Sequence, residues 1–101
     1  MVRGTTPIHT FSTNTDLRGA TVYVTYKQSG ITIVEKTNKD LEITENGIIT
    51  MLTQAETLRF KADKPVEMQV RYIMPNGVAD ASNIIITTVE EVLKGGVIEH
   101  E

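Results

Sequence analysis

Apolar and polar residues alternate along residues 21–27 and again along residues 66–74. In the first stretch, Val22, Val24 and Tyr26 share one face of an extended chain, and residues 23, 25 and 27 share the other. The second stretch has apolar side chains at positions 66, 68, 70, 72 and 74, with Glu, Gln and Arg at 67, 69 and 71. A period of two residues is typical of a β-strand with one buried face. Both stretches are therefore predicted to be strands that border a core.

Turn signals divide the chain at QSG (28–30), ENG (45–47) and PNG (75–77). Each contains glycine, which supplies the positive φ of a tight reversal, and Asn-Gly is the strongest short hairpin signal. Runs rich in Val, Ile, Thr and Tyr flank the turns, as strands prefer. The pattern predicts a β-hairpin at each of these positions.

The connection over residues 53–65 is longer than a hairpin needs. Thr53 and Glu56 have the spacing of a capping box, in which a hydroxyl and a carboxylate bind the first amides of a helix. Leu58 and Phe60 are placed to pack down where such a helical turn ends. We expect a short helical crossover that carries the chain from one sheet to the other.

The run Ile84-Ile85-Ile86 breaks the alternation. An uninterrupted apolar run is typical of a strand that is covered on both faces. These isoleucines are therefore predicted to lie in a central strand, or in one covered on both sides.

The opening RGTTPIHTFST contains Pro7, which fixes its own φ and pushes Thr6 toward extended geometry. Residues 2–7 are thus predicted to be an arm able to reach a partner. Residues 8–13 are predicted to be an edge strand, because Ile8 and Phe11 fall on opposite faces and the alternation is poor.

Counting this opening strand, the pattern predicts about seven short strands and one helical turn in 101 residues. The predicted fold class is all-β: a two-sheet antiparallel β-sandwich of immunoglobulin-like type. One domain is expected, divided into an extended N-terminal arm (1–7), the β-sandwich (8–93) and a C-terminal tail (94–101) that begins with a Gly-Gly pair.

Composition narrows the function classes. The net charge is −3 and the 10 basic residues are scattered, so nucleic-acid binding is not expected, because phosphate neutralisation needs clustered Lys and Arg. The absence of cysteine excludes disulfides, thiolate catalysis and cysteine-based zinc sites. No apolar run approaches ~18 residues, so no membrane span is expected.

Candidate chemistry is sparse. His9 and His100 lie far apart in sequence, and the EHE at 99–101 places its donors in the predicted tail. Glu90 and Glu91 are adjacent, so on a strand they would point to opposite faces and could not converge. No GxSxG, HExxH, P-loop or EF-hand spacing occurs. We therefore expect no catalytic residues, no metal site and no cofactor, and expect that the protein is not an enzyme.

The tyrosines divide by face. Tyr26 and Tyr72 share faces with valines predicted to be buried, which favours packing in the core. Tyr23 lies on the opposite face, with Thr25 and Lys27, and is a candidate for contact with another protein. An exposed aromatic face can also stack on a sugar, which leaves carbohydrate binding as an alternative.

Two stretches carry a family resemblance. The opening RGTTPIHTF resembles the start of small proteins encoded in phages and prophages of Gram-positive gut bacteria. The second half, from Leu52 to Leu93, is similar in layout to the N-terminal sandwich module of phage baseplate upper proteins. The similar features are Leu52-Thr53, the strand over 66–74, Asn76-Gly77, Ser82-Asn83 and the β-run over 84–89. The resemblance implies a structural protein of a tailed-phage particle and transfers no catalytic residues.

The resulting hypothesis is a non-enzymatic structural subunit of a virion: an adaptor, decoration or baseplate-type protein, assembled in the bacterial host cytoplasm. It would act in many copies or as a homo-oligomer, with other virion proteins as partners and with neither nucleic acid nor membrane. The predicted partner-binding residues are Arg3, Gly4, Thr5, Thr6, Tyr23, Gly95, Gly96, Val97 and Ile98. The alternative hypothesis is a free-standing carbohydrate- or cell-surface-binding sandwich.

Overall fold

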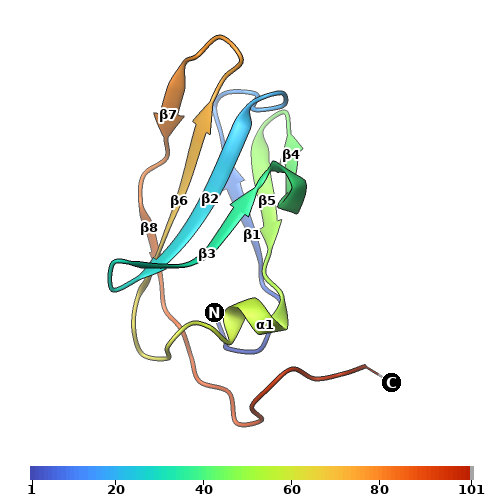
Figure 1. Ribbon diagram of the computed structural model, residues 1–101, viewed down its shortest axis with the longest axis vertical. Coiled ribbons are helices and arrows are strands. Elements are labelled where there is room, and N and C mark those ends of the chain that lie inside the picture. Colours follow the sequence, from blue (N-terminus) through green and yellow to red (C-terminus); the bar gives the residue numbers. More distant parts are fainter. Residues whose placement is uncertain (101) are drawn as a thin grey trace.

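A computed structural model describes residues 1–100 and shows two antiparallel sheets packed together (Figure 1). The three-stranded sheet has the order β1 (Ile8–Ser12), β5 (Gly47–Met51), β4 (Leu41–Thr44). The five-stranded sheet has the order β3 (Ile31–Thr37), β2 (Thr21–Gln28), β6 (Val66–Ile73), with β7 (Ala79–Ala81) and β8 (Ile85–Thr87) both paired with β6. The all-β sandwich predicted from the sequence is confirmed, with eight strands.

The chain visits the two sheets in the order of an immunoglobulin-type sandwich. Strands β1, β5 and β4 take the positions of B, E and D in that fold, and β3, β2 and β6 take those of C′, C and F. Strands β7 and β8 together take the position of G. Ahead of β1, Val2 bridges Glu90 in parallel orientation, so the start of the chain lies beside the end of the domain.

All of the predicted hairpins are present, between β2 and β3, β4 and β5, and β6 and β7. Gly77 adopts a φ of +89°, which an L side chain rarely tolerates. Gly47 is required for a different reason: a Cβ there would lie 2.9 Å from the carbonyl oxygen of Phe11 on the neighbouring strand β1. Gly47, a turn residue identified in the sequence, therefore also allows β1 to approach β5 closely.

The core lies between the inward faces of the two sheets and confirms the alternation predicted for β2 and β6. Its centre is Tyr26, whose ring meets that of Phe60 edge-on at a centroid distance of 6.2 Å. The other buried apolar residues are Phe11, Leu17, Ala20, Val22, Val24, Val34, Ile48, Leu52, Val66, Met68, Val70 and Val89. Phe60 reaches this core from the crossover, as its position in the sequence predicted.

The crossover contains the predicted helical turn, α1 (Gln54–Thr57). The Thr53 hydroxyl accepts a hydrogen bond from the Glu56 amide at 3.1 Å, and the Glu56 carboxylate accepts one from the Thr53 amide at 2.9 Å. This capping box satisfies amides that a helix start would leave unpaired. The turn carries the chain from β5 in one sheet to β6 in the other, which confirms the prediction.

A second connection between the sheets, the 3₁₀ turn η1 (Asn38–Asp40), was not predicted. It joins β3 to β4 and is fixed by the side chain of Asn38. That amide accepts a hydrogen bond from the Val22 amide at 2.7 Å and donates one to the Ala20 carbonyl at 2.7 Å. The Asn38 side chain thus pairs with the Val22 amide and the Ala20 carbonyl at the start of β2, beyond the point where β3 pairs with that strand.

The prediction of a central or doubly covered strand at Ile84–Ile86 is wrong. Strand β8 lies at the rim of the sheet, and within the described residues it pairs with β6 alone. The side chains of Ile84, Ile85 and Ile86 are 56%, 44% and 66% exposed. The final β-run is also interrupted at Ser82, which separates β7 from β8. The Ser82 hydroxyl accepts a hydrogen bond from the Val70 amide, and the Ser82 amide donates one to the Val70 carbonyl.

The N-terminal segment differs from the expected arm separate from the domain. The Arg3 amide donates to the Glu90 carbonyl at 3.0 Å, and its side chain donates to the carbonyls of Phe60 and Leu58 at 2.8 and 3.0 Å. These carbonyls follow α1, where a helix leaves acceptors unsatisfied, and the guanidinium supplies the missing donors. Residues 1–7 are therefore folded onto the domain rather than free of it.

Candidate binding face of the five-stranded sheet

The outward face of the five-stranded sheet carries mostly polar side chains in cross-strand rows. Because Val22, Val24 and Tyr26 point into the core, the alternate residues of β2 face away from it. The register places Tyr23 between Thr37 and Arg71, Thr25 between Glu35 and Gln69, and Lys27 between Thr32 and Glu67. Side chains from β3, β2 and β6 therefore stand next to one another on one surface.

A groove of about 650 Å³ follows these rows. The turn between β2 and β3, at Gly30, borders it on one side, and Ile84 borders it on another. Its floor is formed by the side chains of the rows, including Tyr23. The volume is within the range of about 300–1,000 Å³ in which small-molecule sites usually fall.

The charges in the groove balance. Lys27 and Arg71 contribute two positive groups, and Glu35 and Glu67 contribute two carboxylates. None of the ion pairs found among residues 1–100 uses any of these four side chains. The groove therefore offers both donors and acceptors without a net charge.

Hydrogen bonds within the face orient part of the lining. The Thr25 hydroxyl donates to the Glu35 carboxylate at 3.3 Å. The Gln69 side-chain amide donates to the Ser82 carbonyl at 2.9 Å, and this bond fixes the orientation of the Gln69 side-chain carbonyl oxygen. These contacts hold two acceptors of the groove in defined positions.

Tyr23 is the predicted partner-binding residue that the structure places in this groove. Its side chain is 40% exposed and also borders a smaller hollow beside Ile73. The ring thus combines an apolar surface with access to solvent. Its contact with a partner stays a prediction.

The other predicted partner residues lie elsewhere. Arg3 and Gly4 are engaged within the molecule, the Gly4 amide donating to the Thr57 hydroxyl at 3.0 Å. Thr5 and Thr6 are exposed, and the Thr5 hydroxyl donates to the Val2 carbonyl at 2.6 Å. The structure therefore does not bring this segment together with Tyr23 in one site.

The predicted C-terminal tail extends from the domain beneath α1 (Figure 1). Gly95, Gly96, Val97 and Ile98 are exposed. The Gln54 side chain holds the tail at one point: its carbonyl accepts from the Ile98 amide at 2.7 Å, and its amide donates to the Ile98 carbonyl at 3.1 Å. Glu101, the last residue of the predicted tail, lies outside the described residues.

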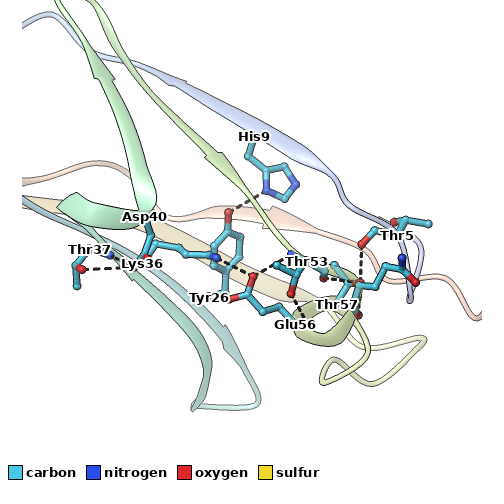
Figure 2. A network of polar contacts seen from close by, with 10 residues as sticks. Thr5, His9, Tyr26, Lys36, Thr37, Asp40, Thr53, Glu56 and Thr57 are labelled. Carbon is cyan, nitrogen blue, oxygen red and sulfur yellow. Dashed lines mark hydrogen bonds and ion pairs between the residues drawn. The ribbon is translucent and has the colours of Figure 1, made fainter. Parts of the chain in front are cut away.

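Inside the sandwich, polar side chains pair with one another near α1 (Figure 2). His9 Nδ1 and the Tyr26 hydroxyl share a hydrogen bond of 2.9 Å. Burial lowers the pKa of the His9 imidazole and raises the pKa of the Tyr26 hydroxyl. Both shifts favour the neutral forms, so this pair joins β1 to β2 as an uncharged contact.

Lys36 is a residue of this network that sequence reasoning missed. It lies on β3, buried, with its ammonium 2.7 Å from the Glu56 carboxylate of α1. The alternation in β3 contains the signal, because Val34 and Lys36 have the same parity and Val34 faces the core. A lysine in such a position needs an acidic partner, which the capping glutamate supplies.

These groups are committed to contacts between elements, and the network lies on the core side of the sheet whose outward face carries the groove. Among residues 1–100, no cluster of three or more His, Cys, Asp or Glu residues is arranged to hold a metal ion. The helical segments of the same part of the chain are too short and too polar to cross a membrane.

Comparison with known proteins finds no matching family model, no matching curated protein and no matching solved structure.

Proposed function

We propose that the protein is a non-enzymatic structural subunit that acts through protein–protein contacts in a multi-copy assembly. The observation that carries this proposal is the exposed apolar edge at Ile84–Ile86. The resemblance to structural proteins of tailed-phage particles supports a virion as the assembly, with other virion proteins as partners. The mechanism is pairing of strand edges, which adds backbone hydrogen bonds between subunits.

The edge has free pairing capacity. The backbone of Val70 bonds to Ser82, so the alternate residues of β6, Met68 and Val66, also direct their backbone groups toward β8. Their partners there are Ile85 and Thr87. The carbonyl of Ile84 and the amide and carbonyl of Ile86 must then point away from β6, on the open side of the sheet.

The other edges have protecting features that β8 lacks. Strand β1 follows Pro7, and the outer strands β3, β4 and β7 carry exposed Glu35, Glu42 and Asp80. Charges and prolines at an edge oppose pairing with other chains. Strand β8 and the isoleucine before it contain neither, so this is the edge best suited to an intermolecular strand.

The same side of the chain already pairs with the extended N-terminal segment four residues after Ile86. The Glu90 amide donates to the Met1 carbonyl at 2.9 Å, and the Arg3 amide donates to the Glu90 carbonyl at 3.0 Å. This parallel pairing stops short of Ile86, so the edge beside the isoleucines stays available within the described residues.

Sedimentation of the purified protein tests the proposal, with Ile86→Lys as the variant. Ile86 is 66% exposed, so its replacement leaves the core intact, while lysine on the edge opposes pairing. The matched control is Ile31→Lys at the β2–β3 turn, where the side chain is 65% exposed. We expect a concentration-dependent oligomer that Ile86→Lys dissociates and Ile31→Lys preserves. An oligomer equally sensitive to both variants would overturn the role of the edge.

A separate experiment tests the virion. Intact phage particles, labelled with antibody against this chain and viewed in negative stain, should carry the protein at a repeated position. Intact particles that lack it would overturn the virion assignment, whatever the oligomeric state of the isolated protein.

A further inference from the structure

We propose that the groove on the outward face of the five-stranded sheet binds a neutral oligosaccharide. The groove adjoins the apolar edge, since Ile84 borders it and Ile86 is the cross-strand partner of Glu67. Its polar side chains come from β2, β3 and β6, so the proposal does not depend on the assembly proposed above. Three properties of the groove carry the inference: an exposed aromatic ring, interleaved donors and acceptors, and balanced charge.

The first property is the position of Tyr23. Its ring is exposed on the sheet face instead of packing in the core, and its cross-strand neighbour on β6 is Arg71. The apolar C–H face of a sugar ring stacks on such an aromatic surface, and the hydroxyl remains able to hydrogen-bond. Arg71 lies where it can donate to the hydroxyls of a sugar stacked on Tyr23.

The second property is the arrangement of hydrogen-bonding groups. Donors from Lys27 and Arg71 stand among acceptors from Glu35 and Glu67, and the amide of Gln69 lies in the same cross-strand row as Glu35. Each sugar hydroxyl can donate and accept at once, so it matches a surface on which both kinds of group alternate. From Tyr23 to Lys27 the rows extend over roughly 13 Å along β2, enough for more than one sugar ring.

The third property distinguishes the ligand class. Two cations and two carboxylates cancel, so the groove gives no net attraction to an anionic glycan, a nucleic acid or a cationic peptide. A neutral ligand with many hydroxyls satisfies the charged groups through hydrogen bonds and leaves none of them opposed by a like charge. A neutral oligosaccharide is therefore the occupant that fits both the charge and the aromatic ring.

A glycan array of neutral, sialylated and sulfated oligosaccharides, probed with the full chain, tests the proposal. We expect binding to neutral members, and the strongest of these is then titrated calorimetrically against variants. Tyr23→Ala should weaken binding about tenfold, because the stacking surface is lost, while Tyr23→Phe should preserve it. Glu67→Gln should also weaken it, since one acceptor becomes partly a donor.

A control variant keeps the test specific. Ile8→Ala, on an exposed position of the other sheet, should leave sugar affinity unchanged. Binding confined to anionic glycans, no binding to any member of the array, or equal affinity of wild type and Tyr23→Ala would each overturn the site.

Discussion

Lys36 on β3 and Glu56 on α1 form an ion pair, with 2.7 Å between Nζ and Oε1, that ties the crossover to the five-stranded sheet. The two side chains are only 9% and 18% exposed. Burial raises the pKa of the Glu56 carboxyl, but the hydrogen bonds from Lys36 and from the Thr53 backbone outweigh it and leave the pKa below its usual value. One carboxylate thus both caps the helix and pairs with a lysine from the sheet.

Lys36→Met should destabilise the protein by about 1–3 kcal/mol at pH 7, because it leaves the Glu56 carboxylate without its cation. Partial solvent screening of that carboxylate keeps the loss below that of a fully buried pair. Urea unfolding measures this, and in a double-mutant cycle with Glu56→Gln we expect a coupling of about 1 kcal/mol. Lys39→Met, at an exposed lysine in η1, is the control and should leave the midpoint unchanged.

The same pair predicts an acid dependence. Since the folded-state pKa of Glu56 is depressed, its contribution is complete above the unfolded value of 4.5 and is lost as pH falls through the folded value. The destabilisation by Lys36→Met should therefore be smaller at pH 3 than at pH 7. An equal destabilisation at both pH values would show that the ion pair does not stabilise the fold.

The contact between His9 and Tyr26 predicts a second pH dependence. Burial depresses the folded-state pKa of His9 below 6.5, so the unfolded chain takes up its proton first as pH falls. This contribution to the free energy of unfolding should be constant well above pH 6.5, decline through 6.5 and level off below the folded-state pKa.

Urea unfolding at pH 5 to 8 measures the decline, and His9→Gln should reduce it. The matched control, His100→Gln, changes the other histidine, on the exposed tail, and should preserve the decline. A decline that persists in His9→Gln would assign it to a different group.

Much of the fold follows from local sequence signals. The period of two in β2 and β6 predicts their buried faces, and Asn-Gly predicts two hairpins, in which Gly77 has a positive φ and Gly47 permits the close approach of β1. The capping box at Thr53 and Glu56 was also predictable, because its partners are three residues apart. Each signal acts within a few residues, which is why the sequence alone contains it.

The errors arose where distant contacts decide. Ile84–Ile86 have an apolar pattern suited to burial, but their exposure depends on whether another strand lies beyond β8, which no local pattern records. The N-terminal segment was predicted to be an arm because the carbonyls that accept from the Arg3 side chain, at Leu58 and Phe60, are more than fifty residues away in the sequence. In the candidate site, Tyr23 was predicted from its face, whereas the charges around it come together only through the register of β3 and β6.

Thr57 predicts how α1 holds the N-terminal segment. Its buried hydroxyl donates to the Thr5 carbonyl at 2.8 Å and accepts from the Gly4 amide at 3.0 Å. Thr57→Val keeps the shape but leaves both backbone groups without this partner, so a loss of about 1–3 kcal/mol is expected. Thermal unfolding measures it, and Thr57→Ser, which keeps the hydroxyl, should stay closer to wild type. If the valine variant is as stable as the serine variant, the hydroxyl does not anchor the segment.

The side chain of Arg3 gives the sharpest test of whether the N-terminal segment belongs to the folded domain. Its two bonds to carbonyls after α1 are partly buried, so Arg3→Ala should cost about 1–3 kcal/mol and increase cleavage within residues 1–7 in limited proteolysis. Deletion of residues 1–6 should destabilise the protein further, since it also removes the bridge between Val2 and Glu90.

Arg18→Ala is the matched control, because that arginine is exposed and pairs with exposed Asp16. It should leave both the unfolding midpoint and the cleavage pattern unchanged. If the truncated protein has the same unfolding midpoint as the full chain, residues 1–6 are a free arm, as the sequence predicted. In that case the effect of the deletion would have to be sought in assembly, by sedimentation of the truncated chain against the Ile86→Lys variant.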